Sequence, residues 1–360
     1  MGNPGFQSQR SGFAQPFGNP PQPGPGGFPS QNQPGPNPGG PPFAPGQYPP
    51  AYPWPKPKKQ SGGAWWLALP VVVLGLMVGY FALTQQSGAK PTNGTKTNDG
   101  KEVVYVNEEY EVPRAGQGPS KPVDPFNDPD LLDKNKFYEQ KVPKPVRCEA
   151  EDADMGDTKA VEKRLQELSE CLTRTFGPPL EAAGYQSYQP RVVVFEGSGG
   201  QTPCGELQSH NAFFCAGNQG IYFSADLGEV IGKNQTVWDY VMAHEYGHNV
   251  QGRNGILLQR IYAQQDASSD DEKFEINRRL EVQADCLAAT FINSNAESMG
   301  YDERDFKTVE KAARRVGDPA DAEEPAHGRS DSRGLWTKRG LAATTYQECN
   351  SFVAPAGEVK

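Results

Sequence analysis

The chain has 360 residues, a length that would suit two ordinary domains, and a formal net charge of −9. Its first 60 residues hold 18 Pro, 11 Gly, four positive charges and no acid, so the remainder is strongly acidic. This balance argues against a nucleic-acid partner, which requires clustered Lys and Arg, and the missing Gly-X-Y period excludes collagen.

Residues 1–60 are expected to be a disordered Pro/Gly-rich arm on the cytoplasmic side of a membrane. Polyproline-like stretches at residues 20–23 and 53–57 could bind an aromatic groove of a cytoplasmic partner. The alternative is a solvated spacer without a fixed partner.

Residues 65–83 form a run of nineteen uncharged residues, close to the ~20 that cross a bilayer. Aromatic residues lie at both ends of this run, as at membrane interfaces. We expect one transmembrane helix over residues 64–84. A signal peptide cleaved after residues 87–89 is the alternative, although its apolar region would be shorter and nearer the start.

The lysines before this span and the cysteines after it indicate its orientation in the membrane. Lys56, Lys58 and Lys59 precede it directly, which favours a cytoplasmic N-terminus. An even number of cysteines follows it, as expected for an oxidising compartment. The chain is therefore predicted to be a single-pass protein of the cell membrane, with its C-terminal part outside the cytoplasm. The six cysteines are Cys148, Cys171, Cys204, Cys215, Cys286 and Cys349.

Residues 85–146 are polar and Pro-spaced, and they are expected to be an extracytoplasmic stalk. Residues 147–353 are expected to form one domain. Proximity in the sequence suggests the disulfides Cys148–Cys171 and Cys204–Cys215, which leaves Cys286 to pair with Cys349.

Within this domain, hydrophobic spacing predicts a helix over 157–176, ended by Gly177-Pro178-Pro179. β-Branched runs predict strands at 191–195 and 220–223, and helical spacing returns later. The fold class is α+β, with a small early sheet and a helical remainder. The later helices are expected at 237–251, 273–293 and 302–316.

The motif His244-Glu245-Tyr246-Gly247-His248 lies in the helix expected over 237–251. Histidines four residues apart face the same side of a helix, so both imidazoles can bind one Zn²⁺. Glu245 is then placed to take a proton from the metal-bound water. The motif predicts a catalytic zinc site.

Catalytic zinc usually has three protein ligands. Glu281 and Asp285 lie four residues apart on the helix expected over 273–293 and therefore share a face. Glu281 is the predicted third ligand, and Asp285 the acceptor for a histidine N–H. The reverse assignment, with Asp285 as the ligand, stays open.

The sequence resembles the bacterial neutral zinc metallopeptidase family, within the gluzincin-like group that includes thermolysin. The resemblance covers residues 148–353 and rests on four segments, 204–222, 244–251, 281–286 and 327–330. It implies a zincin-like fold, one Zn²⁺ per chain and hydrolysis of peptide bonds. The implied ligands are His244, His248 and Glu281, and the implied general base is Glu245.

A developing oxyanion needs a donor besides the metal, and His327 is the candidate. Arg329 or Arg333 could do the same, and His327 could instead be a loop residue bonded to backbone.

The main hypothesis is a membrane-anchored zinc endopeptidase acting on proteins or peptides. The alternatives are a non-proteolytic envelope scaffold with a structural zinc, and a hydrolase of short peptides or peptidoglycan cross-links.

Overall fold

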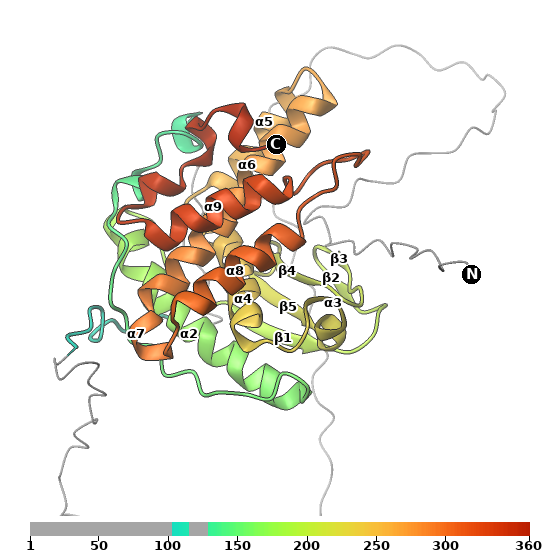
Figure 1. Ribbon diagram of the computed structural model, residues 1–360. Coiled ribbons are helices and arrows are strands. Elements are labelled where there is room, and N and C mark those ends of the chain that lie inside the picture. Colours follow the sequence, from blue (N-terminus) through green and yellow to red (C-terminus); the bar gives the residue numbers. More distant parts are fainter. Residues whose placement is uncertain (1–102, 115–128) are drawn as a thin grey trace, which may run out of the picture. The chain divides into compact units, whose positions relative to one another are not determined.

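The computed structural model of the chain describes residues 103–114 and 129–360 (Figure 1). The arm over residues 1–60 and the membrane span over 64–84 lie outside these residues. Within the described ranges, no helix is both long and apolar enough to cross a bilayer.

The sheet of the domain is small and mixed. Its strands β1 (Arg191–Phe195), β5 (Gly220–Ser224) and β4 (Ala212–Cys215) lie in that order. β1 runs parallel to β5, and β4 runs antiparallel to β5, which leaves β4 at one edge. A two-residue pair, β2 (Gln201–Thr202) with β3 (Gly205–Glu206), lies between β1 and β4 in the chain.

Helices make up most of the rest, so the expected α+β class with a small early sheet is confirmed. The α-helices are α2 (Thr158–Ala182), α3 (Gly228–Ile231), α4 (Gln235–Arg253), α5 (Ile256–Asp266), α6 (Asp270–Ser294), α7 (Ala296–Met299), α8 (Glu303–Arg315) and α9 (Ser330–Ala342). The short 3-10 helices are η2 (Pro129–Leu131), η3 (Lys136–Glu139), η4 (Ala225–Leu227), η5 (Tyr346–Cys349), η6 (Ser351–Val353) and η7 (Ala356–Glu358).

Helix α4 lies at the centre of the packing. It contacts α2 and the edge strand β4 on one side and α6 on another, while α6 packs against α9 and α9 against α8 (Figure 1). Trp238, Met242, Tyr246 and Val250 of α4 are all buried. A helix covered on several sides holds its functional side chains in a rigid frame.

Helix α2 does not end at Gly177 as expected, but continues to Ala182 with Pro178 and Pro179 inside it. Proline has no N–H, so Pro178 leaves the carbonyl of Arg174 without its helical donor. The side-chain amide of Asn107 donates to that carbonyl at 3.1 Å. A contact with a distant segment therefore compensates for the proline, which local sequence rules could not show.

The packed domain also begins before residue 147, where the sequence places its start. Leu131, Phe137 and Val146 are buried, and the ring of Phe137 stacks on that of Tyr346 with 4.3 Å between centroids. Packing continues past the expected end at 353, because Val359 is fully buried. The 3-10 turns in these segments have no helical hydrophobic period, which is why residues 129–146 resemble a stalk.

The three disulfides have the pairing expected from the sequence. Cys148–Cys171 ties the segment before α2 to that helix, and Cys204–Cys215 closes the loop that leads into β4. Cys286–Cys349 joins α6 to η5. These links brace the elements around α4.

Gly340 sets the close approach of α9 to α6, because a Cβ there would overlap the carbonyl oxygen of Cys286. We expect Gly340→Ala to destabilise the fold by about 1–3 kcal/mol, since overpacking forces backbone to move. Denaturant unfolding monitored by circular dichroism measures this. Gly357→Ala is the matched control, because nothing lies within 4 Å of its Cβ position; equal effects of both variants would contradict the packing argument.

Candidate metal centre

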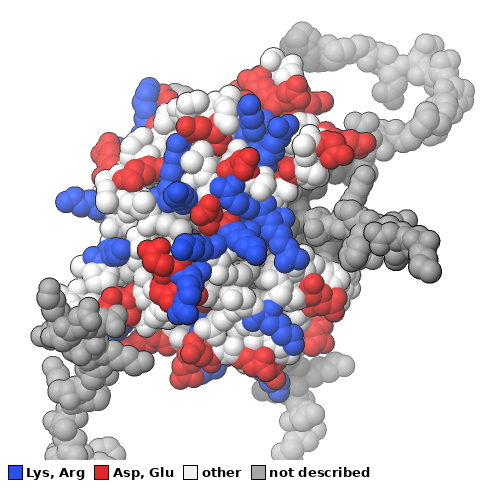
Figure 2. Space-filling model, in the orientation of Figure 1, with Lys and Arg blue, Asp and Glu red and all other residues white. Residues whose placement is uncertain are grey.

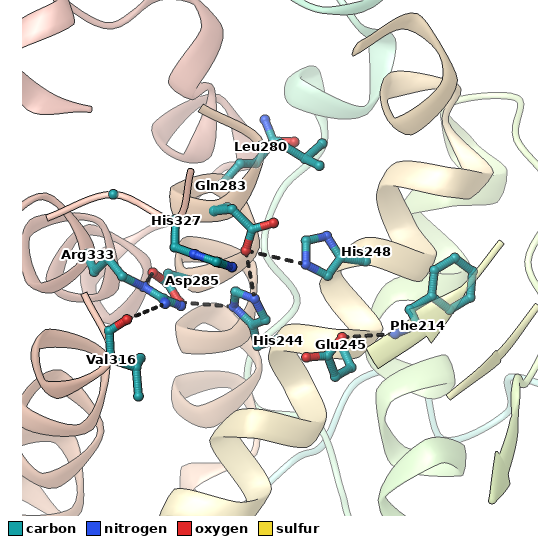
Figure 3. Close-up of polar contacts among 12 residues, drawn as sticks. Phe214, His244, Glu245, His248, Leu280, Gln283, Asp285, Val316, His327 and Arg333 are labelled. Atoms are coloured by element: carbon teal, nitrogen blue, oxygen red, sulfur yellow. Dashed lines mark hydrogen bonds and ion pairs between the residues drawn. The ribbon is translucent and has the colours of Figure 1, made fainter. Parts of the chain in front are cut away.

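His244 and His248 lie one turn apart on α4 and point to the same side (Figure 3). Their rings meet edge to face, with 4.9 Å between centroids. Asn234 caps the N-terminus of this helix, and its side chain accepts a hydrogen bond from the Val237 N–H. Both histidines are thus presented from a capped and buried helix.

The third side chain comes from α6. Gly247 lets α6 approach α4, since a Cβ there would lie 3.2 Å from the Cα of Ala284. Glu281 Oε2 is then 3.4 Å from His244 Nε2 and 3.7 Å from His248 Nε2. One donor atom from each of the three buried side chains lies within 4.8 Å of the others. The structure brings the three predicted ligands together.

The hydrogen-bond partners of the imidazoles decide which ring nitrogens can bind a metal. His244 Nδ1 lies 2.9 Å from Asp285 Oδ1, and His248 Nδ1 lies 2.8 Å from Gln251 Oε1. Because both partners are acceptors, each Nδ1 carries the proton. The Nε2 atoms of both rings are therefore the nitrogens turned toward Glu281.

The atom of the Gln251 amide that faces His248 must be its oxygen, because the amide nitrogen has other partners. Its amide nitrogen donates to the carbonyl of Leu280 at 2.9 Å and to Gln283 Oε1 at 3.0 Å. Gln283 in turn donates to the Tyr138 hydroxyl at 2.8 Å. This chain fixes the amide orientation, and with it the tautomer of His248.

Asp285 lies behind His244 and not among the three ligand atoms. Arg333 contacts both of its oxygens, from Nε to Oδ2 and from Nη2 to Oδ1, at 2.7 Å each. The Tyr240 hydroxyl donates to Oδ1 at 3.0 Å. Burial by itself would raise the pKa of Asp285, but Arg333 and His244 outweigh it and lower that pKa. The carboxylate is therefore held in its ionised form against the Nδ1 of His244, the position expected for it from the sequence.

Glu245 lies beside the histidines and is held in place by a hydrogen bond from a strand of the sheet. The backbone N–H of Phe214, in β4, donates to Glu245 Oε2 at 3.0 Å (Figure 3). Burial raises the pKa of this carboxyl above its ordinary value. This hydrogen bond engages Oε2 alone, so the second oxygen, Oε1, is not held by Phe214.

His327 comes from the segment between α8 and α9, and Figure 3 shows it beside the His244 side of the centre. Its Nδ1 lies 3.2 Å from Asp318 Oδ1, and its backbone N–H donates to Asp318 Oδ2 at 2.7 Å. Asp318 therefore fixes both the loop and the ring, which leaves Nε2 of His327 for another partner.

The donor set fits zinc. Ligand atoms placed 2.0–2.1 Å from Zn²⁺ at tetrahedral corners are about 3.3–3.4 Å apart. The 3.4 and 3.7 Å separations between the imidazoles and Glu281 are close to that spacing. Two neutral imidazoles and one carboxylate also form a known catalytic ligand set that leaves a position open. His244, His248 and Glu281 could therefore hold one zinc ion.

The centre opens into a cavity of about 630 Å³. α4 forms its floor, β4 and α3 line one part of its wall, and α8 lines another. His210, in the loop before β4, also lines it and contacts Glu229 at 3.0 Å. His327 and Arg333 line the cavity as well, whereas Arg329 is not among its lining residues.

Sequence reasoning missed the supporting roles of three residues, among them Arg333, which it considered only as an oxyanion donor. Gln251 is three residues after His248 and shares its helix face, so helical spacing could have identified it. Tyr240 similarly lies four residues before His244. Arg333 gave no such signal, because its partner Asp285 lies on a different helix.

Replacing Asp285 with Asn is expected to lower the zinc affinity of the chain roughly 10–100-fold, because acceptors behind ligating histidines set their orientation and basicity. Competition with a chromophoric chelator measures the affinity, and circular dichroism verifies folding. Asp331→Asn is the matched control, since Asp331 is exposed and pairs only with Arg314 in the described residues. Unchanged zinc affinity in a folded Asp285→Asn variant would refute this role.

Comparisons with known proteins identify the relatives of the chain. Residues 128–352 match the sequence model of the family described as "Putative neutral zinc metallopeptidase". The chain is 31% identical over 196 residues to "Uncharacterized protein YpfJ" of Escherichia coli (strain K12), covering 49% of this chain and 67% of that protein. It is 27% identical over 192 residues to "Uncharacterized protein Rv2575" of Mycobacterium tuberculosis (strain ATCC 25618 / H37Rv), covering 46% and 63%. No solved structure matches it.

Proposed function

Because the chain belongs to the neutral zinc metallopeptidase family, we propose that it is a zinc-dependent endopeptidase with His244, His248 and Glu281 as metal ligands. The observation that carries this proposal is the position of Glu245. A buried carboxylate with a fixed orientation lies beside the three donor atoms, in the same cavity. A purely structural zinc site has no use for such a base and closes its fourth position with a ligand.

Bound zinc would supply Lewis-acid activation of water and of the substrate carbonyl. Glu245 then does the proton chemistry. Its Oε1 takes a proton from the water as the water oxygen attacks the carbonyl carbon, and the proton passes to the amine nitrogen as the C–N bond breaks. The Phe214 N–H holds Oε2, so the carboxylate keeps its orientation through both transfers.

His327 is proposed to stabilise the oxyanion that forms on the substrate. Asp318 accepts a hydrogen bond from the protonated Nδ1 of His327. Nε2 can therefore donate a hydrogen bond into the cavity only in the ring form that carries a proton on both nitrogens. Arg333, the other candidate, is committed to Asp285 through both Nε and Nη2. We therefore assign the oxyanion to His327 and the support of His244 to Arg333.

We further propose that the enzyme is anchored in the cell membrane by residues 64–84, with residues 1–60 in the cytoplasm and the catalytic domain outside. The uncharged run at 65–83 and the three disulfides support this placement. Cysteine labelling with impermeant reagents on intact cells, at single cysteines introduced in either part, tests it.

The activity is tested by incubating the zinc-loaded chain with an unfolded protein and with short end-blocked peptides, followed by mass spectrometry of the products. Internal cleavage of the protein, lost after chelation, is the expected result. Cleavage of the short peptides alone would favour the narrower hydrolase. Bound zinc without any cleavage would replace the proposal with the scaffold.

A further inference from the structure

One face of α8 lines the cavity beside the metal centre. Its cavity-lining residues follow helical spacing and are Thr308, Lys311, Ala312 and Arg315. Two of these four side chains are positively charged. Figure 2 views the molecule from the α8 and α9 side and shows Lys and Arg side chains gathered over these helices.

The cations of α8 differ in their partners. Arg304 pairs with Asp302 at 2.6 Å, and Arg314 pairs with Glu310 at 3.1 Å and with Asp331 at 2.8 Å. Among the described residues, no carboxylate lies within ion-pair distance of Lys311 or Arg315. Arg304 and Arg314, outside the cavity, are thus neutralised, whereas Lys311 and Arg315, which line it, have no carboxylate partner among the described residues.

Lys311 and Arg315 are also four residues apart, so they share one helix face and repel each other. Both are exposed, which lets a ligand reach them without burying an unpaired charge. An anion bound between them would relieve this repulsion and gain two charge-assisted contacts.

The α3 side of the cavity carries negative charge, and this charge is already paired. Glu229 contacts His210 Nε2 at 3.0 Å, and Asp226 lies 3.9 Å from the same nitrogen. The pKa of His210 is raised by this hydrogen bond to Glu229, which favours the charged imidazolium beside the acids. Away from the metal centre, the uncompensated charge among the described cavity-lining residues is therefore the positive pair on α8.

We propose that the cavity selects substrates that carry a carboxylate, which binds between Lys311 and Arg315 while the peptide bond lies at the metal centre. This inference rests on the proposed peptidase function. The carboxylate can belong to an Asp or Glu side chain or to the C-terminus of the peptide, and the chemistry of recognition is the same.

The test uses the zinc-loaded 360-residue chain and end-blocked peptides in which one Glu is moved through the positions around the scissile bond. Each is compared with its Gln counterpart. We expect one position at which Glu raises kcat/KM about tenfold, since each partly exposed charge pair contributes a small factor. A second pair, with a free or an amidated C-terminus and no Glu, distinguishes the terminal carboxylate from the side chain.

Binding gives a readout that does not depend on turnover. Dissociation constants of the same peptides are measured calorimetrically with a Glu245→Gln chain. The Glu preference is expected to disappear in Lys311→Ala/Arg315→Ala and to become a preference for Gln over Glu in Lys311→Glu/Arg315→Glu. Lys307→Ala is the matched control, because Lys307 is an exposed cation of α8 that does not line the cavity.

Equal binding and turnover of all carboxylate and amide peptides would overturn the inference. A preference that Lys307→Ala weakens as much as the double variant does would also overturn it, since the cause would be overall charge. A carboxylate preference in binding without hydrolysis would support the inference and refute the peptidase function.

Discussion

Replacing Glu245 with Gln is expected to lower kcat for peptide hydrolysis by roughly 10²–10⁴-fold, the usual contribution of a general base. Glutamine keeps the shape of the side chain and an oxygen that can accept from the Phe214 N–H. It cannot take a proton from water. Steady-state kinetics with a fluorogenic peptide measure the loss, and mass spectrometry under native conditions verifies that zinc is still bound.

The matched control for this variant is Glu303→Gln, which makes the same chemical change at an exposed position in the first turn of α8. We expect it to retain the wild-type kcat. If the Glu245→Gln chain kept its zinc and hydrolysed peptides at more than about a third of the wild-type rate, Glu245 would not be the base.

The second large effect concerns stability and is expected at Asp239. Truncating this residue to Ala should cost about 3–5 kcal/mol, because it strands a buried charge. Arg164, on α2, is 1% exposed and contacts both oxygens of Asp239, on α4, at 2.8 and 2.6 Å. The Tyr301 hydroxyl donates to the same carboxylate at 2.6 Å. The variant should unfold at a clearly lower denaturant concentration.

Two further variants separate the buried pair from an ordinary ion pair. Glu170→Ala removes the partner of Arg174 on the surface of the same helix, and it should cost less than about 1 kcal/mol. Replacing both members, as Arg164→Met/Asp239→Leu, should recover most of the lost stability, since no charge is then stranded. A cost below about 1 kcal/mol for Asp239→Ala would contradict this account.

The proposed ligand set could be predicted, because helical spacing places its members on shared helix faces. His244 and His248 share a face of α4, Glu281 and Asp285 share a face of α6, and the structure brings these faces together. Helical spacing does not show which helices pack against each other. Arg333 supports Asp285 from α9, a helix whose Gly334 and Gly340 weaken its pattern.

The limits of the fold prediction have the same cause. The strand at 191–195 was predicted with its observed bounds, since a run of β-branched residues is a local signal. β4 contains no β-branched residue, and its four residues are all buried. Pro178 and Pro179 lie inside α2 because Asn107, far away in the sequence, satisfies a freed carbonyl. Tertiary contacts of this kind override local rules.

A zinc titration tests the central claim most directly. The chain is stripped of metal with a chelator, and peptide hydrolysis is followed as zinc is added, alongside His248→Ala. The proposed centre predicts that activity rises to a plateau at about one zinc per chain and that the variant stays inactive at that ratio. Hydrolysis that persists in the stripped chain, or zinc bound at one per chain without hydrolysis, would contradict the claim.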